Sequence, residues 1–207
     1  MSVNMSVSET YSVGGVSFPT NKSIVNDAAI VQAPSLPAAE SAELTVRTND
    51  TEGSLTVAGG STNVQTGNRI DLYWVENGVL KAARGATAGA VAGDVVPFTG
   101  LTGDVLPVAT TTVTVAISVE ADLGALLGDN VNGILFQCPA RATFVVAGGD
   151  DVEDFSKVLD AGVAYAWFEG VGEDNPITGD TIAKVFISHA DESGSQIVKS
   201  AFAYDND

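Results

Sequence analysis

The sequence predicts an all-β protein, an antiparallel β-sandwich arranged as two tandem sandwich-like units with a short helical turn between them. In several short segments apolar residues alternate with small or polar ones, which is the pattern of strands with one buried and one wet face. Turns rich in Gly, Asn and Asp separate these segments. Three strand-like segments of the first half recur in the same order in the second half. We therefore divide the chain into an N-terminal arm with a first strand (1–20), a first unit (21–122), a connection (123–138) and a second unit (139–207).

Length and composition indicate a folded protein. The chain has 207 residues, of which 45% are hydrophobic, so it can bury a sizeable core. No run reaches the roughly 18 apolar residues that a membrane helix needs. The start at Met1 lacks a basic and then apolar leader, so we expect no secretory signal. The single cysteine, Cys138, cannot form a disulfide within the chain.

The charge is strongly acidic. Asp and Glu number 26 against 9 Lys and Arg, which gives a formal net charge of −17. Such a surface repels phosphate backbones, so we expect no nucleic-acid partner. It also needs dissolved salt to screen its self-repulsion. The composition resembles that of halophilic proteins, although an ordinary acidic β protein would have the same charge.

The first 34 residues are expected to form an arm and the first strands. Apolar residues alternate around 3–7, Gly14-Gly15 indicates a turn, and a short strand is expected to end before Pro19. Residues 23–31 are expected to add a strand to the first unit. The arm could pair with a neighbouring subunit as an added strand, or simply fray.

The strongest strand signals lie between residues 43 and 119. Residues 44–48 and 54–58 flank an Asn/Asp/Gly turn and predict a hairpin. A strand at 70–75 ends at Asn77-Gly78, a pair that tolerates positive φ. Residues 112–119 alternate regularly. The Ala- and Gly-rich stretch between residues 79 and 107 predicts a long connection that could contact a neighbouring copy, and residues 120–128 are expected to make the helical turn.

The second half resembles a shortened copy of the first. The segments 143–149, 163–170 and 182–191 follow the order of 54–60, 70–78 and 113–122, and each half carries one tryptophan. A repeat would mean two similar β units, but turn-rich β sequences also look alike without being repeats. Trp74 and Trp167 are expected to pack the two cores; an exposed aromatic row for carbohydrate binding is the alternative.

No catalytic set is evident in the sequence. His189 is the only histidine, and its neighbours in the sequence do not form a triad. Cys138 lies in an apolar run and is expected to be a buried, unreactive thiol. One His and one Cys cannot build a zinc site of the usual kind. The glycine pairs follow strands without a phosphate-binding spacing. We therefore expect no enzyme and no organic cofactor.

Calcium or another cation is the one cofactor that the sequence leaves open, because it needs only oxygen ligands. The carboxylate cluster of Asp150, Asp151, Glu153 and Asp154 is the best candidate, since a bound cation relieves like charges held so close together. The loops 129–133 and 173–180 are weaker candidates. A solvated acidic loop is the alternative for all three.

A family resemblance rests on the hairpin at 44–50, the Tyr73-Trp74 strand and the segment 103–119. In style, and without a diagnostic motif, the chain resembles structural proteins of tailed-virus particles, first capsid decoration proteins and next tail-tube proteins. The resemblance implies a non-enzymatic virion component that stabilises a capsid through symmetric self-association. Its partners would be copies of itself and virion proteins such as the major capsid protein, with no nucleic acid and no membrane. The alternatives are a tail-tube protein in stacked rings and a carbohydrate- or cell-surface-binding β-sandwich module.

Overall fold

The structure, a computed structural model, describes residues 2–13, 16–32, 36–61, 63–122, 131–147, 153–168 and 184–204, and it is all-β throughout these segments. The predicted all-β class is therefore confirmed. None of the described segments forms a helix long and apolar enough to cross a membrane.

The described residues form sixteen strands in three sheets. In chain order the strands are β1 Ser2–Val13, β2 Val16–Gln32, β3 Glu40–Arg47, β4 Gly53–Thr56, β5 Arg69–Glu76, β6 Val79–Ala88, β7 Val95–Thr99, β8 Thr102–Gly103, β9 Thr112–Ile117, β10 Val119–Asp122, β11 Val131–Gln137, β12 Ala142–Ala147, β13 Glu153–Leu159, β14 Ala164–Phe168, β15 Lys184–His189 and β16 Lys199–Tyr204.

The first half of the chain folds into a closed barrel. Its strand order is β5-β9-β3-β4-β7-β6, and pairing of β5 with β6 closes the ring, while the short β8 attaches to β6. The inward side chains fill the interior, and the largest of them are Leu44, Leu55, Ile70, Leu72, Trp74 and Phe98. Closure pairs the edges of the sheet within the molecule, so the barrel presents no long free edge.

The second half forms a β-sandwich of two sheets. One sheet has the order β1-β2-β16-β11-β14 and the other β10-β15-β12-β13. Their facing side chains make one core, in which Phe136 and Phe144 stack with ring centroids 4.5 Å apart and Phe202 meets Phe136 edge-on. This part is the sandwich that the sequence predicted.

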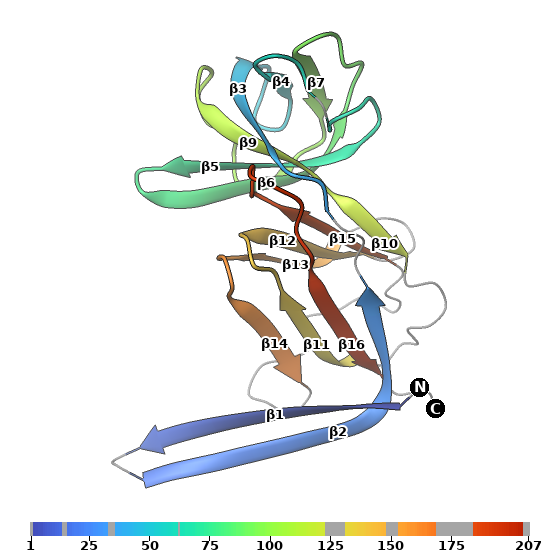
Figure 1. The fold of residues 1–207 in the computed structure, drawn as a ribbon. Coiled ribbons are helices and arrows are strands. Elements are labelled where there is room, and N and C mark those ends of the chain that lie inside the picture. Colours follow the sequence, from blue (N-terminus) through green and yellow to red (C-terminus); the bar gives the residue numbers. More distant parts are fainter. Residues whose placement is uncertain are drawn as a thin grey trace.

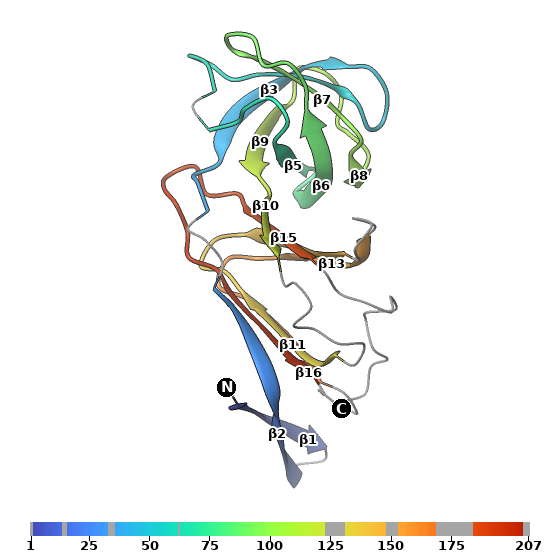
Figure 2. The ribbon, with the colours of Figure 1, turned by 90° about the vertical axis from the view of Figure 1, so that its right-hand side faces the viewer.

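The four-stranded sheet of the sandwich is also the floor on which the barrel sits (Figures 1 and 2). All six residues of β12 are buried. Phe144 belongs to the sandwich core, whereas its neighbour Thr143 contacts Tyr73 of the barrel. The molecule therefore has three layers, and β12, in the middle of this sheet, is buried on both faces.

Three predictions about the layout are wrong. The stretch 79–107, expected to be a long connection, contains the barrel strands β6, β7 and β8. The first unit is a closed barrel and not a sandwich, because β6 reaches both β5 and β7 and so joins the two ends of the sheet. The helical turn expected at 120–128 is not found in its described part: residues 119–122 form β10, which pairs with β15. The rest of that segment, 123–130, lies outside the described residues.

The sheet pairing also divides the chain differently from the expected boundary at residue 21. Strand β2 pairs with β16, next to the C-terminus, and not with any barrel strand. The sandwich thus takes its strands from both ends of the chain, and the barrel is inserted between them. Strand β2 also continues through Pro19, where a strand end was expected. A ribbon of two strands has free edges, and proline, which lacks an N–H, is tolerated there.

The N-terminal arm is a long two-stranded ribbon. Strands β1 and β2 pair antiparallel over twelve positions, from Ser2↔Asp27 to Val13↔Val16. Only residues 27–32 of β2 also pair with β16. The remainder of the ribbon bends away from β16 and, in the view of Figure 1, runs below the lower ends of the sandwich strands.

The two halves do not share one pairing scheme. In the barrel, β5 pairs with β9. Their sequence counterparts, β14 and β15, lie in different sheets of the sandwich. The similar segments all form strands, as expected, but neighbours in one half are not neighbours in the other.

Candidate functional site

The densest polar arrangement lies where the barrel meets the sandwich, and it starts from a β-bulge. On one side of the bulge Ile70 pairs with Ala86 and on the other Leu72 pairs with Ala83, so Arg84 and Gly85 of β6 together face the single residue Asp71 of β5. Bulges re-aim side chains.

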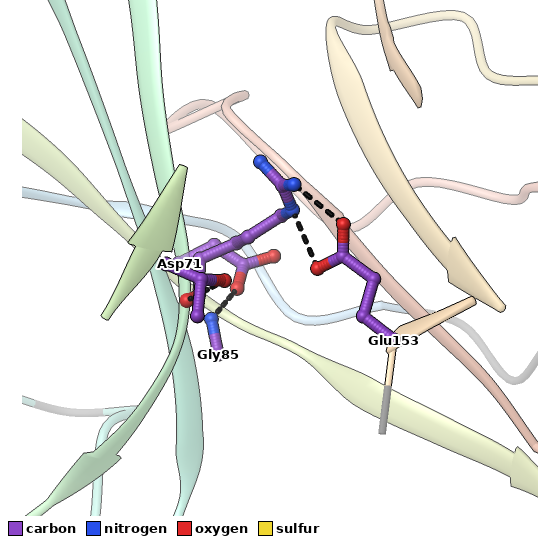
Figure 3. A network of polar contacts seen from close by, with 5 residues as sticks. Asp71, Gly85 and Glu153 are labelled. Carbon is purple, nitrogen blue, oxygen red and sulfur yellow. Dashed lines mark hydrogen bonds and ion pairs between the residues drawn. The ribbon is translucent and has the colours of Figure 1, made fainter. Parts of the chain in front are cut away.

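Gly85 makes this bulge possible and ties it to Asp71. Gly85 has φ +79°, a conformation that other residues adopt at a cost. Its N–H donates to Asp71 Oδ1 at 2.8 Å. Figure 3 shows this contact beside the two contacts made on Glu153.

Asp71 is fully buried and continues into a line of hydroxyl groups that crosses between the layers. Ser188 Oγ of β15 lies 2.5 Å from Asp71 Oδ2 and 2.7 Å from Tyr73 Oη. Tyr73 Oη in turn lies 2.7 Å from Thr143 Oγ1 of β12. All four residues are buried. The line therefore joins two barrel residues to two sandwich residues without access to water.

The proton count along this line depends on the state of Asp71. Three contacts need three protons, and each hydroxyl supplies one. Tyr73 Oη donates its proton to Thr143 Oγ1. With an ionised Asp71, Ser188 donates to the carboxylate, and the contact between Ser188 and Tyr73 then has no proton. With a protonated Asp71, the carboxyl proton goes to Ser188 and Ser188 donates to Tyr73, so that all three contacts have a proton. Burial raises the pKa of Asp71, although Ser188, Gly85 and the nearby arginines oppose this. Burial likewise raises the pKa of Tyr73.

Two arginines at the bulge reach across to the sandwich. Arg84 donates to Glu153 of β13 through two contacts, Nε to Oε2 at 3.0 Å and Nη2 to Oε1 at 2.5 Å (Figure 3). Their side chains are 16% and 27% exposed, so this pair is partly shielded from water. Arg69 lies over the Phe186 ring, with Cζ 4.1 Å from the ring centroid. We call these six side chains (Asp71, Tyr73, Arg84, Thr143, Glu153 and Ser188) the junction.

The junction contains a carboxyl group, Asp71, and a hydroxyl group, Ser188, that could act as an acid and a nucleophile, but a substrate cannot reach them. Asp71, Thr143 and Ser188 each have 0% exposure. A substrate would reach Ser188 Oγ only if the barrel lifted off the sheet. The arrangement supports a fixed joint between the layers, because buried polar groups are most stable when each finds a partner.

His189 is a buried strand-end residue. Its Nδ1 accepts the Asp191 N–H at 3.1 Å, and its Nε2 lies 3.3 Å from the Leu36 carbonyl oxygen, so Nε2 carries the proton and donates. Burial lowers the pKa of His189, which favours this neutral form. The ring thereby fastens the segment before β3 to the end of β15. It does not meet Cys138 in a reacting pair.

Cys138 is 1% exposed and belongs to the sandwich core. Burial raises the pKa of its thiol, so the reactive thiolate is disfavoured. It forms part of the wall of a depression of about 290 Å³, which Gly162, Ile197 and Lys199 also line.

The predicted cation cluster is represented by one side chain. Glu153 is engaged by Arg84. Asp150 and Asp151, and the side chain of Asp154, lie outside the described residues, as do Asp129, Asn130 and the loop 173–180. Within the described part of the chain no three His, Cys, Asp or Glu residues gather as metal ligands would. The cation site stays a prediction.

Both tryptophans are core residues, as expected. Trp74 and Trp167 are each 4% exposed, the first inside the barrel and the second inside the sandwich. Neither is available for an aromatic row on the surface. The carbohydrate-binding alternative thereby loses the residues on which it rested.

The junction itself was not predicted. Asp71 has no role in any site that the sequence predicts. The one sign of it in the sequence is an aspartate, Asp71, inside the apolar strand 70–75. An aspartate at that position is explained equally well by a side chain that faces solvent. Ser188 and Thr143 give no signal in the sequence.

Comparisons with known proteins add no name to this fold. A scan against protein-family models found no matching family, and searches of curated proteins and of solved structures found no match.

Proposed function

We propose that this chain is a non-enzymatic structural protein of a virus particle, and that it decorates and stabilises the capsid by self-association. The observation that supports this is the ribbon of β1 and β2. From Val3 to Asn26 its residues pair only with each other among the described strands.

A ribbon of this kind is poorly stable when alone. Two strands without a third strand or a covering layer are marginal in water, and ordering costs about 1–2 kcal/mol of backbone entropy per residue. A partner that adds a strand or a surface would repay this cost. An arm that becomes stable on contact suits a protein that works by assembly.

The charge fits assembly in a saline medium. Copies with a net charge of −17 repel one another. Dissolved salt shortens the range of this repulsion to about 10 Å at 0.1 M. We therefore expect self-association to increase with salt.

A tail-tube protein that forms stacked rings is the second candidate. It is favoured by the five-stranded sheet, because the strands at its two ends, β1 and β14, each have one described neighbour. A sheet that accepts a strand from a second copy at its end can continue from copy to copy around a ring.

Light scattering after size-exclusion chromatography, at low and high salt, tests self-association. The full chain is compared with a variant that lacks residues 2–26 but keeps the part of β2 that pairs with β16. We expect a salt-dependent oligomer from the full chain and a monomer from the variant. A full chain that stays monomeric at every salt and protein concentration would refute the proposal. Electron microscopy of the oligomer then separates small closed oligomers, expected of decoration, from stacked rings, expected of a tube.

A further inference from the structure

The barrel and the sandwich have separate cores. Each core is a cluster of buried apolar side chains, and among the described residues no side chain belongs to both. Among the described strands, no barrel strand pairs with a sandwich strand. The chain passes between the two parts twice, from β2 to β3 and, through the single residue Ser118, from β9 to β10. The barrel can therefore separate from the sandwich while both cores stay intact.

The apolar contact between the two parts is small in the described part of the chain. The buried cluster at this contact consists of Ala39, Tyr73, Ala82 and Ala116, with Ala190 packed against it. Four of its five members are alanines, which bury little apolar surface, so the cluster contributes much less than either core. Polar contacts therefore make a large part of the attachment. Domains joined through contacts of this kind move relative to each other unless something holds them.

The line from Asp71 to Thr143 holds the two parts together at every step. Each of its three contacts joins a barrel residue to a sandwich residue: Asp71 to Ser188, Ser188 to Tyr73, and Tyr73 to Thr143. Because Tyr73 donates to Thr143, the middle contact has a proton only when Ser188 donates to Tyr73, and Ser188 is free to do so only when Asp71 is protonated.

Loss of the Asp71 proton therefore weakens the attachment in two ways. Ser188 turns its proton to the carboxylate, and the oxygens of Ser188 and Tyr73 then face each other at 2.7 Å with no proton between them. In addition a negative charge is left in a fully buried position, which is costly unless the group reaches water. Separation of the barrel from the sandwich gives it that access.

We propose that the proton on Asp71 is a latch: the barrel stays on the four-stranded sheet while Asp71 is protonated, and it separates from the sheet, with both parts still folded, when the proton leaves. The latch lies within one molecule and works with or without self-association. It makes the face of the middle sheet that the barrel covers accessible to water only in the open form.

The latch fixes how opening depends on pH. Burial raises the pKa of Asp71 in the closed form, and hydration returns it to its ordinary value in the open form. Opening therefore releases a proton. Its equilibrium constant should rise by up to about tenfold per pH unit between the two pKa values and level off above the higher one.

The other described charged groups near Asp71 keep their state while Asp71 titrates. Arg69 on β5 and Arg84 on β6 remain charged at every pH used. Tyr73 remains neutral, because burial raises its pKa. Burial alone would raise the pKa of Glu153 on β13, but the contact with Arg84 lowers it, so Glu153 is ionised above about pH 5. The residues opposite Asp71 on the neighbouring strands carry no charge: Gly85 on β6, Ala116 on β9 and Ser188 on β15.

Thiol labelling at two adjacent positions of β12 tests the proposal. Val145 lies on the same face of β12 as Thr143, towards the barrel, and is 1% exposed; Val146 belongs to the sandwich core and is 0% exposed. In a Cys138→Ala background, Val145→Cys reports separation of the barrel, and the matched control Val146→Cys reports opening of the sandwich itself. Labelling rates are measured from about pH 5 to 9. The ratio of the two rates removes the pH dependence that both thiols share.

We expect Val145→Cys to react faster than Val146→Cys, and the ratio of their rates to rise at least tenfold over this range. Adding Asp71→Asn should keep the ratio low and constant, because the amide donates to Ser188 as the protonated acid does and does not titrate. Adding Tyr73→Phe removes the middle contact and should raise the ratio at every pH.

Three outcomes would overturn the latch: equal rates at the two positions, a ratio that does not change with pH, or the same rise in the Asp71→Asn chain. Calorimetry of the unaltered chain is a second test that needs no cysteine variant. We expect one unfolding transition near pH 5 and two near pH 9, where the barrel and the sandwich unfold separately. A single transition at both pH values would also refute the proposal, whatever the oligomeric state of the protein.

Discussion

Replacing Tyr73 by Phe tests whether the junction holds the barrel on the sandwich. The change removes one oxygen and keeps the ring, which is 2% exposed. That oxygen makes two buried contacts of 2.7 Å, to Ser188 and Thr143. A net hydrogen bond contributes about 0.5–1.5 kcal/mol, and a buried group left without a partner costs about 1–3 kcal/mol. We expect Tyr73→Phe to lower the free energy of unfolding by about 2 kcal/mol, or the Tm by roughly 4–8 °C for a chain of this length.

Calorimetry and urea unfolding measure this loss, and a double-mutant cycle with Ser188→Ala assigns it to the contact between the two residues. We expect a coupling energy of about 0.5–2 kcal/mol, because the two hydroxyls belong to one line. Thr114→Val is the control, since its hydroxyl makes an exposed contact with Glu192 and should matter little. If Tyr73→Phe stays within about 0.5 kcal/mol of the unaltered chain, or if the cycle shows strict additivity, the line does not hold the layers together.

Three further predictions concern the same region. Asp71→Asn should weaken the dependence of the free energy of unfolding on pH. Because the pKa of Asp71 is raised in the folded state, its contribution to stability is complete at low pH and is lost as the pH rises through that pKa. Asn imitates the protonated form of Asp71 and does not titrate. Glu153→Gln should lower the free energy of unfolding at neutral pH and have little effect in acid. Burial alone would raise the pKa of Glu153, but the contact with Arg84 outweighs it and lowers that pKa, so the contribution of this pair is lost as the pH falls. Unfolding curves from pH 3 to 8 measure both variants. Gly85→Ala should lower the free energy of unfolding by about 1–2 kcal/mol. The residue has φ +79°, and the new Cβ would lie 2.7 Å from the Arg69 guanidinium. A crystal structure of the variant should show that guanidinium displaced.

Local pattern was enough to predict the hairpin of β3 and β4, the strands β5 and β9, and the turn that follows β5, but not β6. The turn at Asn77-Gly78 is found with φ 52° and 76°, as the residue types require. The hairpin of β3 and β4 and the strand β9 lie where alternation placed them. Each of these strands pairs with a strand close in the sequence or buries one face only. A short stretch of sequence therefore contains the pattern that predicts the strand.

The layered arrangement could not be predicted, because it depends on contacts between residues that lie far apart in the sequence. Strand β12 reads Ala-Thr-Phe-Val-Val-Ala, and its near-continuous apolar run is the sign of burial on both faces. The sequence does not tell which layer covers the second face. The pairing of β2 with β16 joins residues at the two ends of the chain, and no local signal encodes it. Closure of the barrel by β5 and β6 is likewise a property of the whole sheet.

The attachment of the arm bears on the assembly proposal. Residues 27–32 of β2 pair along six positions with β16, whose Phe202 is fully buried against Phe136 in the sandwich core. A pull on the arm is therefore carried by a row of backbone hydrogen bonds into the core. A terminus that merely frays needs no such anchor. The barrel, held by the junction on the far side of the middle sheet, lies at the opposite end of the molecule from the arm (Figures 1 and 2), so copies joined through the arm would leave their barrels free to face outward from the assembly.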